Sequence, residues 1–349
     1  MKTINEDKLH GASMTELVSW FQTEYPELVA SMRACSHHGE SLNPYHVEGD
    51  IFCHTMMVCK QAENASYPVK IAALLHDIGK PSTRAMNPKN GNVSFYNHDA
   101  VSAFMSLEIL KRPELGLTKE QQVRIFNLIA LHTQIYKLSV EQLAAIGDKE
   151  LVSDLIELGK ADHAGRFHTK GDAVIPTIQE IPFKSQYKEA SMISKNKDVT
   201  ILVGLPASGK STWVKQQNGF VVSRDSVLMV EALNCKALGM NFTYEQAWNH
   251  VDQNKVNNGL EKLFQQSKKR DKVVVDMTHM SKKSRRRTLS HFDSSYKKKA
   301  VVFLTDLETL FLQNSKRSGK VIDEAVIQKM IRSFYPPTLE EFDEIEYVL

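Results

Sequence analysis

The stretch GLPASGKST (204–212) decides the fold of the second half of this 349-residue chain. It follows the apolar run VTILV (199–203) and opens a segment of helical composition. A strand, a glycine-rich loop and a helix in this order form the context in which the Walker A pattern binds nucleotide phosphates. We therefore predict an NTP site in which Lys210 neutralises phosphate oxygens and Ser211 holds Mg²⁺. Nucleotide contacts are expected from Gly204, Ala207, Ser208, Gly209, Lys210, Ser211 and Thr212.

Short β-branched runs continue beyond this loop. FVV (220–222), VVV (273–275) and AVVFL (300–304) alternate with helical stretches. Such alternation is typical of an α/β domain with a parallel sheet. Before residue 166, by contrast, helix-length apolar patterns dominate and no clear strand is visible.

The segment 166–197 separates these two patterns. It contains two prolines, mixed charge and no sustained helical period, which is typical of a linker or docking segment. The expected organisation is an all-α domain (1–165), this segment, and an α/β P-loop domain (198–349).

Composition and charge limit the classes of protein. The chain is 42% hydrophobic and 24% charged, and it has neither an apolar run long enough to span a bilayer nor the h-region of a signal peptide. We expect a cytoplasmic protein with no membrane partner. Residues 1–197 carry a net charge of −2 and residues 198–349 a net charge of +5. Basic clusters at 268–272, 282–287 and 296–299 indicate a polyanion partner, with a solvated helical face as the alternative.

Acidic residues follow the predicted strands of the second half. Asp225, in SRD (223–225), is expected to be the general base that accepts a proton from a phosphoryl acceptor. Asp276 is expected either near Mg²⁺ or as an anchor for the acceptor. Residues 315–330 are expected to form a lid from which Arg317 reaches the γ-phosphate; the alternative is an exposed helix-end cation.

The first half contains LLHDIGK (74–80) at the end of a run that is apolar on nearly every face. Burying His76 and Asp77 without partners would cost several kcal/mol, so they are expected to bind something. Four further side chains lie on inward faces of predicted helices: His54, His98, His132 and Asp162.

Imidazoles and carboxylates converging in a helical bundle favour a transition metal such as Mn²⁺, Ni²⁺ or Co²⁺. Such a metal would activate water for attack on a phosphorus centre. Lys80 is expected to contact a phosphate; a helix-C-terminal lysine favoured by the helix dipole is the alternative.

The motifs of the first half resemble those of the HD phosphohydrolase superfamily over roughly residues 40 to 165. They are NPYHVEGDIFCHT (43–55), LLHDIGK (74–80), NHDAVSA (97–103), LHT (131–133) and KADHAG (160–165). The match is closest to the HD domains of transfer-RNA nucleotidyltransferases and of bifunctional end-healing enzymes. The resemblance implies that His54, His76, Asp77 and Asp162 form the core metal set. His98 and His132 lie where two-metal members place ligands or phosphate contacts.

The second half resembles the 5'-OH polynucleotide kinase branch of P-loop phosphotransferases over about residues 198–337. The resemblance implies that Lys210 and Ser211 hold phosphate and Mg²⁺, Asp225 is the base, Asp276 supports the site and Arg317 is the lid arginine. One position departs from that pattern: Leu228 stands where many of those kinases hold the acceptor's 3' phosphate with an arginine. Arg224 or an arginine of 285–287 would have to compensate.

Together the halves resemble the HD-Pnk type of RNA end-healing enzyme. The resemblance implies that ATP or another NTP phosphorylates a 5'-OH end, and that the metal site hydrolyses a 2',3'-cyclic phosphate or 2'-phosphate end. It also implies RNA as substrate, with DNA as an alternative, and an RNA ligase as functional partner. Two other readings stay open. One is an HD nucleotidase or cyclic-nucleotide phosphodiesterase with an NTP-sensing P-loop domain. The other is a nucleic-acid-binding ATPase with a non-catalytic helical module.

Overall fold

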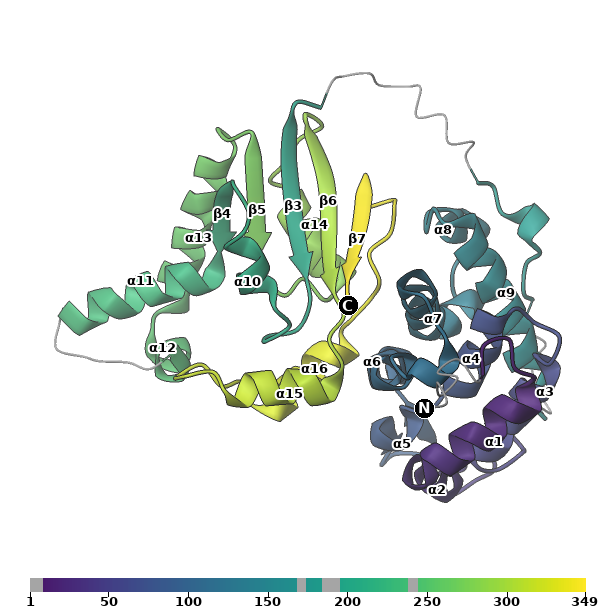
Figure 1. Cartoon of the computed structure of the whole chain (residues 1–349). Coiled ribbons are helices and arrows are strands. Elements are labelled where there is room, and N and C mark those ends of the chain that lie inside the picture. Colours follow the sequence, from purple (N-terminus) through teal and green to yellow (C-terminus); the bar gives the residue numbers. More distant parts are fainter. Residues whose placement is uncertain (1–8, 168–173, 184–194, 238–243) are drawn as a thin grey trace, which may run out of the picture. The chain divides into compact units, whose positions relative to one another are not determined.

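A computed structural model describes residues 9–167, 174–183, 195–237 and 244–349 (Figure 1). The chain divides into two compact units, Met1–Lys184 and Ser185–Leu349. No helix of the described residues is both long enough and apolar enough to cross a membrane.

Helices dominate the first unit. Their bounds are α1 Met14–Glu24, α2 Pro26–Ala34, α3 Ile51–Gln61, α4 Tyr67–Leu75, α5 Lys80–Thr83, α6 His98–Leu110, α7 Lys119–Leu131, α8 Val140–Ala144 and α9 Lys149–Ala164. Short 3₁₀ turns are η1 Pro113–Leu115, η2 His132–Tyr136 and η3 Ile178–Glu180. Helix α4 packs against α3, α7 and α9, so its buried apolar residues form the centre of the bundle.

One prediction for this unit was incomplete. Strands β1 (Arg84–Met86) and β2 (Val93–Phe95) form an antiparallel hairpin where no strand was expected. Each strand has only three residues, and Asn90-Gly91 lies in the connection between them, with Gly91 at φ 66°. Strands this short are below the length at which alternation is visible in a sequence.

The second unit is an α/β domain with a five-stranded parallel sheet, as predicted (Figure 1). The strands are β3 Lys197–Val203, β4 Phe220–Ser223, β5 Lys272–Asp276, β6 Tyr296–Phe303 and β7 Glu344–Val348, in the order β4-β5-β3-β6-β7. The helices are α10 Lys210–Val214, α11 Arg224–Ala237, α12 Tyr244–His250, α13 Gln253–Ser267, α14 Lys282–Leu289, α15 Leu307–Ser315 and α16 Glu324–Arg332. The chain leaves β3 toward one edge and later returns to the other side of β3. Ligands bind at such a switch point, outside the carboxyl ends of the strands.

Strand β7 was missed because its sequence, EIEYV, reads as part of an acidic tail. It pairs in parallel with β6, which contains the basic cluster 296–299. Lys297 and Lys299 each place Nζ 2.7 Å from Glu344, and Lys299 also contacts Glu346 at 2.7 Å. This cluster therefore neutralises the edge strand and is a weaker argument for a polyanion partner than the sequence indicated.

Candidate functional site

The metal-type residues of the first unit gather at the end of α4. This helix ends at Leu75, although the apolar run in the sequence continues to Gly79, and His76 is its C-cap. Asp77 lies in the turn that follows, before α5 begins at Lys80 with a proline in its first turn. His76 and Asp77 are each 1% exposed.

Four imidazoles surround the carboxylate of Asp77. Its Oδ2 lies 3.2 Å from Nε2 of His76 and 3.6 Å from Nε2 of His54. Its Oδ1 lies 3.3 Å from Nε2 of His98 and 3.8 Å from Nε2 of His132. These side chains form two groups of three whose ligand atoms lie within 4.8 Å of one another, and both groups contain Asp77. Either group would be able to hold a metal ion, and Asp77 would be a ligand in both.

The hydrogen bonds of the imidazoles favour a cation. In His76, His98 and His132, Nδ1 lies 2.7–2.8 Å from the carbonyl oxygen three residues earlier. A carbonyl only accepts, so Nδ1 donates and Nε2 of the neutral ring carries a lone pair. Nε2 of His98 and Nε2 of His132 are 3.1 Å apart, so two lone pairs meet unless a metal ion or proton lies between them.

Orphaned polar atoms at the same point support this fit. Asp77 Oδ1 and Nε2 of His76 are buried without a hydrogen-bond partner in the described part of the chain, and Asp77 Oδ2 has an ion pair with Lys80 at 2.7 Å. Such atoms cost free energy unless a ligand satisfies them. Burial acts to raise the pKa of Asp77, but the positive charge of neighbouring groups, Lys80 among them, holds it well below its usual range, so the group is a carboxylate.

Asp162 lies on α9 at the edge of this cluster. Its Oδ1 is 3.1 Å from Nε2 of His54, and its Oδ2 accepts a hydrogen bond of 2.7 Å from Tyr136 Oη. Arg166 forms an ion pair with it, although the sequence placed this arginine in the connecting segment. The spacing of four residues from Asp162 was the available signal, because side chains four apart on a helix are neighbours.

Lys80 does not cap the end of α4, because it begins α5. Its Nζ lies 2.7 Å from Asp77 Oδ2 and 3.1 Å from Nε2 of His37, and the residue is 5% exposed. The helix-dipole alternative therefore does not apply. The contact with phosphate remains a prediction.

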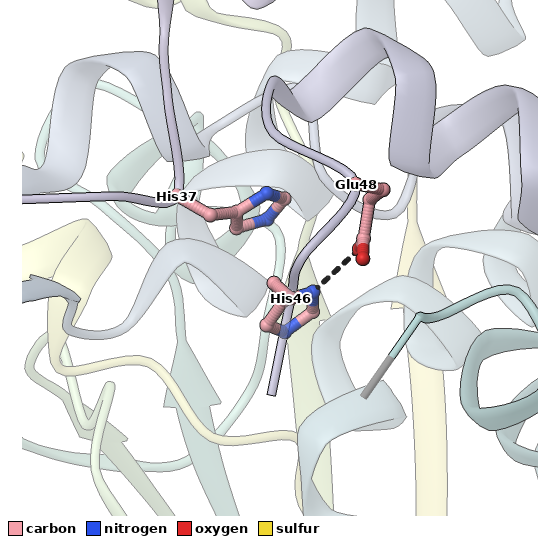
Figure 2. Close-up of side chains that lie close together, drawn as sticks. All are labelled: His37, His46 and Glu48. Carbon is pink, nitrogen blue, oxygen red and sulfur yellow. Dashed lines mark hydrogen bonds and ion pairs between the residues drawn. The ribbon is translucent and has the colours of Figure 1, made fainter. Parts of the chain in front are cut away.

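His37, His46 and Glu48 form an outer layer that the sequence analysis missed (Figure 2). The rings of His37 and His46 stack at 4.2 Å, and His46 Nδ1 lies 2.9 Å from Glu48 Oε1. The same oxygen lies 3.0 Å from Nδ1 of His54, so Glu48 orients that predicted ligand. Burial lowers the pKa of His46 to about 4, although Glu48 opposes the shift. All three residues lie outside regular elements, so helical periodicity could not reveal them.

In the second unit, the Walker A stretch joins β3 to α10. Ala207 and Gly209 adopt φ values of 65° and 90°, which turn the backbone tightly before the helix. Lys210 Nζ donates to the carbonyls of Gly204, at 2.8 Å, and Leu205. The lysine therefore lies folded against its own loop, and the predicted phosphate contact would require it to exchange these carbonyls for phosphate oxygens.

A cavity of about 1020 Å³ lies over this loop. Its volume is at the upper end of the roughly 300–1,000 Å³ typical of ligand sites. Most of the residues predicted to form the NTP and acceptor site line this cavity: Ala207, Gly209, Lys210, Ser211, Thr212, Asp225, Asp276 and Arg317. Gly204 and Ser208 do not line it, but both accept hydrogen bonds from Lys210 Nζ.

Three charged groups face this cavity from different elements. Asp225, in the first turn of α11, accepts a hydrogen bond of 2.7 Å from Tyr244 and forms an ion pair with Lys320. Burial lowers the pKa of Lys210 to about 8, although Asp276 and Asp225 oppose the shift. Arg317 has a buried Nη1 without a hydrogen-bond partner among the described residues, which favours an anionic ligand.

The arginines proposed to compensate for Leu228 differ in their surroundings. Leu228 itself is fully buried in an apolar cluster, so it contacts no acceptor. Arg285 is also fully buried and is bound to Glu341 and to backbone carbonyls, which excludes it from substrate contact. Arg224 and Arg287 line the cavity.

Comparisons with known proteins agree with two domains. Residues 51–164 match the HD domain family, and residues 199–337 match a family described as an AAA domain. The A-adding tRNA nucleotidyltransferase of Deinococcus radiodurans is 33% identical over 121 residues, which cover 32% of this chain and 27% of that protein. A gluconokinase from Sinorhizobium meliloti 1021 matches with 14% identity and a TM-score of 0.29, over 44% of this chain and 82% of that one.

The chain therefore carries an HD domain followed by a P-loop kinase-like domain. The roles assigned above to individual residues remain predictions.

Proposed function

We propose that this chain heals nucleic-acid ends: it phosphorylates 5'-OH ends with an NTP and hydrolyses 2',3'-cyclic phosphate or 2'-phosphate ends at the HD site. The substrate would be RNA broken by a ribonuclease-type cleavage, and an RNA ligase would join the healed ends. The similarity to an enzyme that acts on tRNA supports a nucleic-acid substrate, although it covers only part of either chain.

The observation that carries the kinase half is the cavity that places Lys210 and Arg317 around the same space as Asp225. In the transfer, the 5' oxygen would attack the γ-phosphorus while its proton passes to Asp225, and the bond to the β-phosphate oxygen would break. Lys210 and Arg317 would offset the charge on the transferred group. Ser211 and Asp276 would hold Mg²⁺, which supplies further charge neutralisation.

The phosphoesterase half rests on the paired ligand groups around Asp77. His54, His76, Asp77, His98 and His132 would hold one or two transition-metal ions, and Asp162 would join them if its contact with His54 opens. The metal would supply an activated water at neutral pH and polarise the phosphoryl oxygens. Lys80 pairs with Asp77 and Arg166 pairs with Asp162, so these two cations offset the negative charge of the site's own carboxylates.

Incubation with ATP and an oligoribonucleotide bearing a 5'-OH and a 2',3'-cyclic phosphate tests the proposal. We expect a 5'-phosphate and a free 3' end, with Asp225→Asn blocking only the first change and His76→Ala only the second. Hydrolysis of ATP without transfer would refute the kinase half. Conversion of mononucleotides alone would favour a nucleotidase over an end-healing enzyme.

A further inference from the structure

Helix α12 presents two aromatic side chains to the cavity of the P-loop unit. Ala247 and Val251 are buried in the apolar cluster that also contains Leu228. Tyr244, which packs against this cluster, and Trp248, four positions on, both line the cavity. Trp248 is 45% exposed, although burying a large apolar ring would be favourable. The fold therefore leaves a flat π surface open to a ligand.

This aromatic pair is connected to the predicted general base. The two rings lie 6.5 Å apart with an interplanar angle of 32°, and Tyr244 Oη donates to Asp225 at 2.7 Å. Lys320 lies 4.4 Å from the centroid of the Tyr244 ring and also pairs with Asp225. Trp248 is therefore connected through Tyr244 to the group that would receive the proton.

Arg224 borders the same surface. Its guanidinium lies 5.5 Å from the centroid of the Trp248 ring, and its two terminal nitrogens donate to Asn257 at 2.7 Å and Gln253 at 2.8 Å. These bonds hold a positive charge at a defined place at the edge of the cavity. Leu228, the position that would carry a phosphate-binding arginine in related kinases, is buried.

We propose that Trp248, with Tyr244 nearby and Arg224 over one face of its ring, is the subsite for the 5'-terminal nucleoside of the acceptor, whose base uses the other face. The base would stack on Trp248, and Arg224 would contact the phosphate that follows it. Stacking on an aromatic ring tolerates any base, so the subsite would select polynucleotides without selecting sequence. This inference rests on the proposed kinase activity and adds the site that positions its acceptor.

Steady-state kinetics with two acceptors provide the test. One is a 5'-OH oligoribonucleotide, and the other is the same strand with an abasic ribose at its 5' end. Trp248→Ala should raise the KM for the first about 5- to 150-fold, the range for loss of one base–aromatic stack, and should leave the KM for ATP within about twofold. Trp248→Phe should recover most of the loss. The abasic strand should be used about equally by Trp248→Ala and the unmutated chain. Leu233→Ala, at an exposed apolar position outside the cavity lining, is the matched control.

Two results would overturn the inference. A rise in the KM for ATP equal to that for the acceptor would assign Trp248 to the nucleotide donor. An equal loss on both acceptors would make its role structural. These outcomes differ from failure of the proposed function, in which the unmutated chain would phosphorylate neither strand.

Binding without turnover gives a second readout. A 5'-OH trinucleotide should quench the tryptophan fluorescence of the unmutated chain. Trp248→Phe retains Trp20 and Trp213 and should lose this quenching. Unchanged quenching in that variant would count against the subsite even if the kinetics agreed.

Discussion

Replacing Arg285 by methionine is expected to destabilise the P-loop unit, whereas replacing Arg287 by methionine is expected to affect only substrate binding. Arg285 is fully buried, and its Nε and Nη2 form a two-pronged ion pair with Glu341 at 3.0 and 2.8 Å. Its Nη1 donates to the carbonyls of Tyr335, His279 and Met280 at 2.8, 3.2 and 3.3 Å. The guanidinium therefore ties α14 to the segment before β7.

The methionine leaves the carboxylate of Glu341 buried without its partner. Breaking a buried ion pair in this way costs about 3–5 kcal/mol. In a unit of this size, each kcal/mol lowers Tm by about 2–4 °C, so Tm should fall by roughly 6–20 °C. Arg287→Met is the matched control, because this arginine lines the cavity and its loss leaves no buried charge unpaired.

Thermal unfolding followed by tryptophan fluorescence and by calorimetry measures the effect. Arg285→Met combined with Glu341→Leu should recover part of the lost stability, because removing both partners leaves no buried charge. A change in Tm below about 2 °C for Arg285→Met would refute the reasoning. So would a double variant whose loss equals the sum of the two single losses.

Three further outcomes are expected. Asp77→Ala should lower bound transition metal, measured by elemental analysis of the purified protein, and abolish hydrolysis of cyclic phosphate ends; full metal content would remove Asp77 as a ligand. Gly79→Ala places a Cβ 2.6 Å from the backbone nitrogen of Ser102, so either α6, with His98, or the turn that contains Asp77 must shift. Metal content should therefore fall, and unchanged content would contradict the shared Asp77–His98 group. Nucleotide affinity should weaken as pH rises through about 8, because Lys210 in the empty site loses its proton in that range. Calorimetric titration with nucleotide from about pH 7 to 9.5 measures this affinity, and an affinity that does not change with pH would contradict the lowered pKa of Lys210.

The sequence predicted the architecture because its signals are local. Each strand of the P-loop unit except β7 contains a run of apolar and β-branched residues, and the loop 204–212 has a spacing that few other structures require. The buried helix α4 was visible in the same way, and so was the presence of His76 and Asp77 at its end. Burial without partners then predicted a ligand from physical chemistry alone.

The structure decided which of these side chains meet. His54, His98 and His132 lie on three different helices or helix ends, and only the packing of those helices brings their Nε2 atoms around one carboxylate. Glu48 joins them from a loop, where no periodicity marks an inward-facing position.

In the second unit, the tertiary structure likewise decided which basic side chains are paired with acidic groups. Lys297 and Arg285 belong to basic clusters that look alike in the sequence. Parallel pairing of β7 with β6 places Glu344 beside Lys297, whereas Arg285 is buried in an ion pair with Glu341. Arg224 remains at the cavity beside Trp248. Composition determines how many charges a domain carries, but a charge is available to a partner only if no acidic group of the same fold lies beside it. That depends on contacts between residues far apart in the chain, which only the tertiary structure determines.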